Sequence, residues 1–326
     1  MKVSVCIPTF NSAAYVRECI ESVLAQNGVE LEVIVFDNAS EDDTWEIVQS
    51  FSDPRISAFR SDQNRGMAAN FNCTLNKARG EYVKLLCSDD RLEPSALSLQ
   101  AQFLDEHEEI CMATSGRLLI DSSNNVIATV QWFSRPVIIE AVNLRTISLV
   151  HGNIVGEPSA VMFRREAWLR AGPFRDGLMT LIDLEMWLRL SRDGAVGYLP
   201  SHLCRVRRHA CSMTSQFLES GVAQDADLQI TESLLHELQA GRLIRRVSIG
   251  KVAGAYLRNG VNGLRRGLVK RAAYFFAIAF RLDPAFVGLF LYLALFRPGV
   301  LGLRVGRDGR PSICTNGTLR SAPELR

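Results

Sequence analysis

The chain has 326 residues, of which 47% are apolar, a composition typical of a globular protein with a full hydrophobic core. Its eight cysteines form no Cys-x-x-Cys pair, which argues against a zinc or disulfide framework and predicts reduced core residues of a cytosolic protein. Residues 1–241 carry 21 Lys and Arg against 32 Asp and Glu, whereas residues 242–310 carry 14 against two, an asymmetry that predicts two different partners.

The first 90 residues alternate between strand and helix patterns. Strands are predicted at 2–7, 31–36, 56–59 and 82–86, and helices at 14–26, 40–51 (capped by Ser40) and 67–78. Repeated β-α-β units imply a mostly parallel sheet with helices on both faces, whose ligands bind at the carboxyl ends of the strands. The polar residues after three strands, Asn11, Asp37 and 88–90, should therefore gather on one rim. Because a strand pattern begins at Val3, we expect no signal peptide.

The middle of the chain is less regular. It predicts strands at 112–120, 158–163, 198–199 and 203–206, a turn at 121–125, and helices at 94–106, 165–171, 181–192 and 218–239.

Two apolar runs follow, at 272–280 and 285–296, with basic residues between and around them. The longer run would reach roughly 18 Å as a helix, which is short of the roughly 30 Å hydrocarbon core of a bilayer. A basic, apolar segment that is too short to span a membrane is typical of a surface-lying anchor. The alternative is an ordinary helical subdomain packed on the body of the protein.

Asp89 and Asp90 end the apolar run at 82–86. Two adjacent carboxylates repel each other unless a positive charge lies between or above them, and hard oxygen ligands suit Mg²⁺ or Mn²⁺ bound to substrate phosphates. The segment therefore predicts a metal–diphosphate site. The same residues precede Leu92-Glu93-Pro94, so a helix cap is the alternative.

Several segments, taken in order, resemble the motifs of the family 2 glycosyltransferases, which have the GT-A fold. They are residues 3–11, 37–44, 64–70, 78–82, 88–90 and 182–190, followed by Arg208-His209, and together they cover about residues 1–215. The resemblance implies an α/β, Rossmann-like GT-A domain at 1–215. Beyond it we expect a helical basic and apolar segment at 216–310 and a disordered tail at 311–326.

The resemblance also implies roles for individual residues on the donor side. The nucleotide pocket would be lined by Pro8, Thr9, Asn11, Asp37, Asn70 and Asp89, with Asp37 bonding the base and Asp89 facing the ribose. Asp90 would hold Mg²⁺ or Mn²⁺ on the diphosphate, and His209 would reach the metal or the diphosphate. Without the resemblance, Asp37 reads as a turn residue and His209 as a surface residue of a basic loop.

On the acceptor side, Asp183 would be the general base that takes the proton of the acceptor hydroxyl. Read alone, Asp183 lies near a predicted helix start and is either a cap or a tuned base. The family often has Glu before this Asp, where this chain has Ile182, so Glu185 is an alternative base. Glu157 lies in a segment that resembles one near the acceptor side in this family, where it would orient an acceptor hydroxyl. The alternative is a solvated turn residue.

The resulting prediction is a metal-dependent, inverting glycosyltransferase. It would use a nucleoside diphosphate sugar, expected to be a UDP-sugar, as the donor. The sugar would move to a hydroxyl of a glycan or lipid-linked acceptor in cell-surface polysaccharide synthesis. We expect a cytoplasmic protein, peripheral on the inner face of the cell membrane, with no nucleic-acid partner. An inactive GT-A nucleotide-binding scaffold is the alternative. A dinucleotide oxidoreductase is excluded, because Pro-Thr-Phe-Asn follows the first strand in place of the phosphate-cradling glycines.

Overall fold

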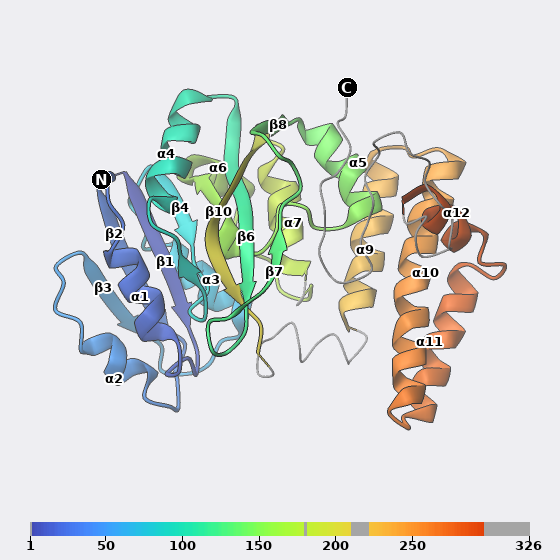
Figure 1. Ribbon diagram of the computed structural model, residues 1–326, viewed down its shortest axis with the longest axis horizontal. Helices are drawn as coiled ribbons and strands as arrows, with labels where there is room; N and C mark the ends of the chain where they lie inside the picture. The colour runs from blue at the N-terminus through green and yellow to red at the C-terminus, as the bar shows by residue number, and fades with distance from the viewer. Residues whose placement is uncertain (1, 179–180, 210–221, 297–326) are drawn as a thin grey trace. The chain divides into compact units, whose positions relative to one another are not determined.

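The computed structural model describes residues 2–178, 181–209 and 222–296 (Figure 1). The chain divides into two compact units. The first, here called the sheet unit, comprises Met1–Ala141, Val155–Gly177 and Ile182–Arg208, and the second, the helical unit, comprises Val142–Ile154, Leu178–Leu181 and His209–Arg326. The tail predicted at 311–326 lies outside the described residues.

The strands of the sheet unit form one ten-stranded sheet within the described part of the chain. They are β1 (Val3–Thr9), β2 (Leu31–Asp37), β3 (Ile56–Arg60), β4 (Tyr82–Leu85), β5 (Arg91–Leu92), β6 (Ile110–Ile120), β7 (Val126–Val130), β8 (Val137–Ile139), β9 (Met162–Arg164) and β10 (Ala195–Arg207).

The main path of the sheet runs β3-β2-β1-β4-β9-β6-β10-β5, with β7 on β6 and β8 on β10. The first four strands are mutually parallel, β9 is antiparallel to both β4 and β6, and β6 is parallel to β10. It follows that β1, β2, β3, β4, β6 and β10 all point the same way, so their carboxyl ends share one rim. The expected mostly parallel sheet is confirmed, with antiparallel strands inserted in its second half.

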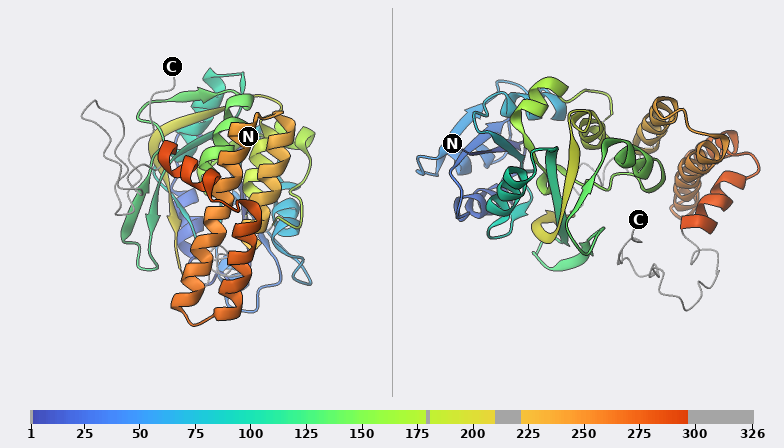
Figure 2. Two further views of the ribbon diagram at one scale, coloured as in Figure 1. Left: turned by 90° about the vertical axis from the view of Figure 1, so that its right-hand side faces the viewer. Right: turned by 90° about the horizontal axis from the view of Figure 1, so that it is seen from above.

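Helices cover both faces of this sheet, as predicted (Figures 1 and 2). They are α1 (Val16–Leu24), α2 (Thr44–Gln49), α3 (Met67–Leu75), α4 (Ala96–Glu106), α6 (Arg165–Ala171) and α7 (Ile182–Leu190), with a 3-10 turn at Pro158–Ala160. Alternate β1 residues point to opposite faces. Val5 and Ile7 pack with α1 and α4 in the main core, whereas the Cys6 thiol donates to the Thr74 carbonyl of α3.

Three expectations about local structure are wrong. Ser40 does not cap a helix, because α2 begins at Thr44 and the Ser40 hydroxyl donates to Asp37 instead. Residues 158–163 are a 3-10 turn followed by β9. The two short strands expected at 198–199 and 203–206 are one long strand, β10, whose register against β6 shifts between Leu199 and Cys204.

The helical unit contains α5 (Ala141–His151), α9 (Val222–Glu237), α10 (Arg242–Arg265), α11 (Val269–Leu282) and α12 (Val287–Phe296). Figure 2 shows α10 and α11 running antiparallel, side by side. Between them lies a small core of Val252, Tyr256, Phe275 and Ala279. At the crossing of α10 and α12, a Cβ on Gly250 would lie 2.0 Å from the Gly288 carbonyl carbon, so this close approach needs glycine.

None of the described helices combines the length and the apolar character needed to cross a bilayer.

Candidate active site

The carboxyl ends of β1 and β2 are joined by polar side chains, as the rim prediction requires. The Thr9 hydroxyl donates to Asp37 Oδ1 at 3.1 Å. From α3, the Asn70 amide donates to the Thr9 carbonyl at 3.1 Å. Asn70 is 5% exposed, and within the described residues its Oδ1 has no hydrogen-bond partner. A buried acceptor of this kind is costly unless something donates to it, which fits a ligand-binding role.

Asp37 is fully buried and is held from several directions. Its Oδ1 accepts bonds from the hydroxyls of Thr9 and Ser40, and its Oδ2 accepts the Ser40 N–H at 3.1 Å and faces Arg60 Nε at 3.2 Å. Because a carboxylate has about four acceptor positions, we expect a base to reach Asp37 only if one of these contacts gives way. Its predicted bond to the base stays a prediction.

The turn after β1 carries Asn11, which has a left-handed φ of +48°. Its side-chain oxygen accepts the Glu41 N–H at 2.9 Å, and its own N–H donates to the Ser40 hydroxyl at 2.9 Å. Ala39, in the facing turn after β2, is also left-handed, with φ of +60°. Backbone strain of this kind persists only where surrounding contacts impose it, often at functional sites. Pro8 precedes this turn within β1, paired with Phe36.

Asp89 and Asp90 follow β4 on the same rim, and the helix-cap alternative does not hold. Residues Arg91–Leu92 form β5, and α4 begins only at Ala96, after Ser95. Ligand atoms of Cys87, Asp89 and Asp90 lie within 4.8 Å of one another, a spacing that can hold a metal ion.

The environment of these carboxylates favours a cation. Burial, and then the charge of Asp89, raise the pKa of Asp90 well above its ordinary value. Bonds from the Ser159 hydroxyl (2.5 Å) and the Arg207 N–H (2.8 Å) oppose that shift. Burial also raises the pKa of the Cys87 thiol, so it stays protonated, and hard cations prefer oxygen. The donor set thus fits Mg²⁺ or Mn²⁺ on Asp89 and Asp90.

Arg207, the last residue of β10, ties the Asp89–Asp90 loop to two other segments. Its guanidinium donates to the Asp89 carbonyl (2.9 Å), the Asp121 carbonyl (3.1 Å) and the Glu18 carboxylate of α1 (3.0 Å). It also lies over the ring of Tyr15, 4.4 Å from its centroid. Arg207 is only 2% exposed. Its geometry is that of a positioning residue for the loop.

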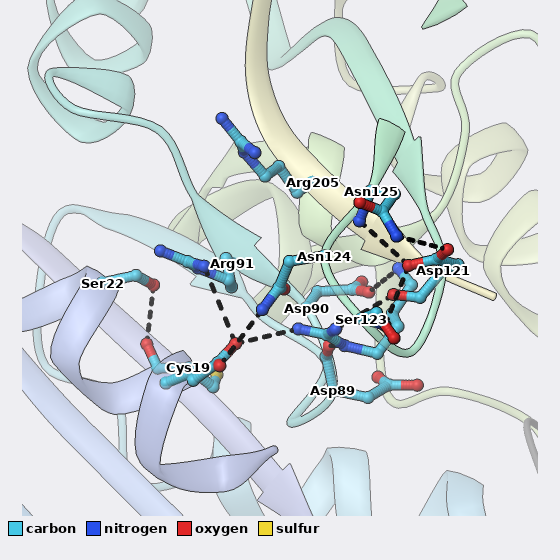
Figure 3. A network of polar contacts seen from close by, with 12 residues as sticks. Cys19, Ser22, Asp89, Asp90, Arg91, Asp121, Ser123, Asn124, Asn125 and Arg205 are labelled. Carbon is cyan, nitrogen blue, oxygen red and sulfur yellow. Dashed lines mark hydrogen bonds and ion pairs between the residues drawn. The ribbon is translucent and has the colours of Figure 1, made fainter. Parts of the chain in front are cut away.

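The turn at Asp121–Asn125, which follows β6, completes this side of the rim. Figure 3 shows Asp89 and Asp90 beside it, with Asn124 reaching toward α1. Asn124 donates to Glu18 at 3.3 Å, and the predicted turn is confirmed by the Asp121 N–H bond to the Asn125 carbonyl at 3.0 Å.

Glu157 lies between two arginines on the other side of the Asp89–Asp90 loop. Arg117 Nε, in β6, is 2.5 Å from Glu157 Oε2, and Arg208 donates to Oε1. Burial alone would raise the pKa of Glu157, but the charges of Arg117 and Arg208 outweigh it and leave the pKa lowered. Glu157 is thus an ion-paired carboxylate, not a solvated turn residue.

Asp183 lies in the first turn of α7, in one register with Trp187. The Trp187 indole donates to the Gly156 carbonyl at 2.9 Å, which fixes α7 against the turn that carries Glu157. Burial raises the pKa of Asp183 to about 7; the Leu184 N–H bond opposes the shift and the charge of Glu157 adds to it. A carboxylate that titrates near neutrality is suited to act as a general base.

Glu185, the alternative base, is held by two arginines. Arg189 Nη2 is 2.8 Å from Glu185 Oε2, and Arg175 Nη1 is 3.2 Å from its Oε1. Arg189 in turn donates to the carbonyls of residues 171–173. These contacts give Glu185 a role in holding α7 to α6, which favours Asp183 as the base.

The structure therefore brings Thr9, Asn11, Asp37 and Asn70 together where β1 and β2 end. Asp89 and Asp90 follow the neighbouring strand β4, and the charge of Glu157 raises the pKa of both Asp90 and Asp183. His209 follows Arg208 directly but opens the helical unit, and its contact with a metal stays a prediction.

Three residues that the sequence analysis did not single out contribute to the site: Arg117, Ser159 and Arg207. A signal was present for Arg117, which is the one charged residue of β6. An unpaired charge there would be too costly to keep.

Comparison with known proteins supports this reading. The family model described as "Glycosyl transferase family 2" matches residues 4–166, half of the chain. An uncharacterized protein of Mycobacterium tuberculosis is 35% identical over 225 residues, covering 64% of this chain and 68% of that relative. The chondroitin synthase of Pasteurella multocida is 31% identical over 202 residues, which are 60% of this chain but only 20% of the synthase.

Solved structures share the fold. A fragment of S. aureus TarS in complex with UDP-GlcNAc superposes with a TM-score of 0.60 at 18% identity, covering 85% of this chain and 91% of that one. A mannosyltransferase from Pyrobaculum calidifontis, in complex with GDP-Man and Mn²⁺, gives a TM-score of 0.55 at 17% identity, covering 92% and 82%. The chain belongs to glycosyl transferase family 2 and is a glycosyltransferase with the GT-A fold.

Proposed function

We propose that this protein is a metal-dependent, inverting glycosyltransferase that uses a nucleoside diphosphate sugar. One observation carries the proposal: hydrogen bonds join the three separate segments that carry Asp90, Glu157 and Asp183, since Ser159 donates to Asp90 and Trp187 of α7 donates to the Gly156 carbonyl. Such a cluster is costly to bury without a cation and a substrate to use it. A nucleotide-side cluster around Asp37 and Asn70 lies on the same rim.

Asp89 and Asp90 are the residues that would hold a divalent cation. When bound, the cation would stabilise the negative charge that develops on the departing diphosphate. Arg207 and Ser159 fix the two oxygens of Asp90, so the carboxylate is oriented before any ligand binds. Preorganised charge of this kind needs little rearrangement during the reaction.

Asp183 is proposed to accept the proton of the acceptor hydroxyl. The acceptor oxygen bonds to the anomeric carbon, its proton passes to the Asp183 carboxylate, and the electron pair of the broken carbon–oxygen bond leaves with the diphosphate. Attack from the face opposite the leaving group inverts the anomeric centre. The lowered pKa of Glu157 keeps it ionised, so it can accept a hydrogen bond from a second acceptor hydroxyl.

Neighbours and relatives suggest the substrates. TarS is solved with UDP-GlcNAc, and a mannosyltransferase with GDP-Man and Mn²⁺. We propose a UDP-sugar as donor, Mg²⁺ or Mn²⁺ as cofactor, and a hydroxyl of a glycan or lipid-linked glycan as acceptor, in cell-surface polysaccharide synthesis. The basic C-terminal part further suggests work at the inner face of an anionic membrane.

A panel of nucleotide sugars, assayed for hydrolysis and transfer with and without Mn²⁺, tests this proposal. We expect turnover of one UDP-sugar that depends on the metal and is lost in Asp183→Asn. Titration calorimetry with UDP is the companion measurement. Binding of UDP with no turnover of any donor would favour the inactive scaffold instead.

A further inference from the structure

The helical unit carries a continuous basic segment with no acidic residue. Residues 242–282, which span α10 and α11, contain ten Lys and Arg and no Asp or Glu. Two of the acidic residues of α9 contact the side of α10 that faces them: Asp227 lies 3.3 Å from Lys251 Nζ, and Asp225 accepts the Tyr256 hydroxyl. The segment therefore presents a strong positive potential to its surroundings.

Within the described residues, helix α11 packs one apolar face against α10 and leaves other apolar side chains exposed. Ala272, Phe275 and Ala279 are buried against α10. Away from it Tyr274 and Phe280 are 55% and 53% exposed, although both carry large rings. Tyr274 is in helical register with Lys270 and Arg281, and Phe280 lies roughly 120° around the helix from Tyr274, at the edge of the same exposed surface. Exposed aromatic side chains beside Lys and Arg on one helix are typical of a helix that lies in a membrane interface.

Cations bracket this exposed face. Lys270 and Arg281 lie at its two ends, four residues before Tyr274 and one after Phe280, and both are exposed. At the turn that joins α10 to α11, Leu268 and Val269 are 44% and 64% exposed. Exposed apolar and basic side chains thus alternate along the exposed surface of this helix. We call this surface the α11 face; it comprises Leu268, Val269, Lys270, Tyr274, Phe280 and Arg281.

We propose that the α11 face docks on an anionic lipid surface, with α11 lying along the interface. Tyr274, Phe280 and the apolar turn would enter the headgroup region, while Lys270 and Arg281 pair with lipid phosphates. This deepens, and rests on, the membrane location proposed above. Charge argues against a second copy as the occupant, since two such faces would repel each other.

Co-sedimentation of the full-length protein with vesicles tests the inference. We expect binding to vesicles that contain phosphatidylglycerol, little binding to pure phosphatidylcholine, and release by salt. Tyr274→Ser/Phe280→Ser and Lys270→Glu/Arg281→Glu should each weaken the affinity roughly tenfold or more. Lys270→Gln/Arg281→Gln removes the charges more mildly and should give an intermediate loss.

Two matched controls lie in the sheet unit. Val126→Ser/Ile127→Ser removes side chains that are 51% and 55% exposed on β7, and Lys77→Glu/Arg135→Glu makes the same change in net charge as the α11 pair. Both should bind vesicles like the wild type. Circular dichroism of each variant establishes that the fold is kept.

Several outcomes would overturn the inference. They are equal binding to neutral and anionic vesicles, α11 variants that bind like the controls, or α11 variants that lose self-association in analytical ultracentrifugation while keeping vesicle binding. Donor hydrolysis measured without vesicles reports on the catalytic proposal separately. An active enzyme that ignores vesicles contradicts only the docking surface, and an inactive protein that binds them contradicts only the catalytic proposal.

Discussion

Arg207 and Asp90, 117 residues apart in the chain, are joined where β10 ends and its antiparallel partner β5 begins: the Arg207 N–H donates to Asp90 Oδ1 at 2.8 Å. The side chain of the same arginine then holds the Asp89 carbonyl and reaches Glu18. One residue of β10 therefore sets both the orientation of the proposed metal ligand and the path of its loop. The metal site depends on the fold as much as on its two carboxylates.

Arg207→Lys is expected to weaken metal binding while leaving the nucleotide side of the rim intact. Lysine keeps the charge but cannot donate to two carbonyls and a carboxylate in the planar geometry of arginine. We expect the Mn²⁺ concentration for half-maximal donor hydrolysis to rise about tenfold to a hundredfold, and the free energy of unfolding to fall by about 2 kcal/mol.

The matched control is Arg205→Lys, two residues earlier on β10. Arg205 pairs with Glu93 and is 31% exposed, so its loss should change neither the Mn²⁺ requirement nor the stability by much. Equal Mn²⁺ requirements in the two variants would show that Arg207 does not position the metal site.

Asp90→Asn should abolish transfer and keep the fold. Burial and Asp89 raise the pKa of Asp90, so its charge is unfavourable in the folded protein and the neutral amide removes that cost. We expect donor turnover to fall by roughly a hundredfold or more, with an unfolding midpoint equal to or above that of the wild type. Normal activity in this variant refutes the assignment of Asp90 as a metal ligand.

The sequence predicts the rim because each of its motifs is local. An apolar strand followed at once by polar residues places Asn11, Asp37 and the Asp89–Asp90 pair at strand ends, and the sheet then brings the ends together. The same logic fails for β10, where Pro200, Ser201 and His202 interrupt the apolar pattern. In the structure β10 continues through these residues, and its register against β6 shifts there.

The parts that the sequence could not predict depend on distant contacts. The bond from Arg207 to Glu18 spans 189 residues and the bond from Arg208 to Glu157 spans 51. No pattern in the nearby sequence predicts either pair. A helical segment was expected at 216–310, but the bounds of α10 were not, and glycines such as Gly250 and Gly254 lower the helix propensity of that stretch. They are accommodated because α12 packs directly against them.

Donor transfer should increase with pH through about 7, because Asp183 must be ionised to accept a proton and its pKa is raised to about 7 by burial. Asp183→Asn should abolish this limb of the pH profile together with transfer, and leave UDP binding unchanged. A pH–rate profile of kcat, measured with saturating donor and Mn²⁺, makes the comparison.

The same pKa predicts an effect on stability. A carboxyl whose pKa rises from 3.8 to about 7 on folding contributes stability below pH 3.8 that is lost as the pH rises through about 7. Asp183→Asn should therefore be no more stable than the wild type at pH 4 and more stable at pH 8. Urea unfolding of both proteins at the two pH values tests this prediction. The same difference in unfolding free energy between variant and wild type at pH 4 and pH 8 would contradict the raised pKa.

Gly156→Ala is expected to damage the Glu157 side of the site. Gly156 has φ of +100°, and a Cβ there would lie 2.7 Å from the Arg117 guanidinium, which would have to move away from Glu157. Gly177→Ala is the matched control, since its φ is +93° but its Cβ would meet nothing within 4 Å. Both variants carry the backbone strain of about 1 kcal/mol, but only Gly156→Ala should also raise the acceptor KM. Equal KM values would show that the Arg117–Glu157 pair does not act on the acceptor.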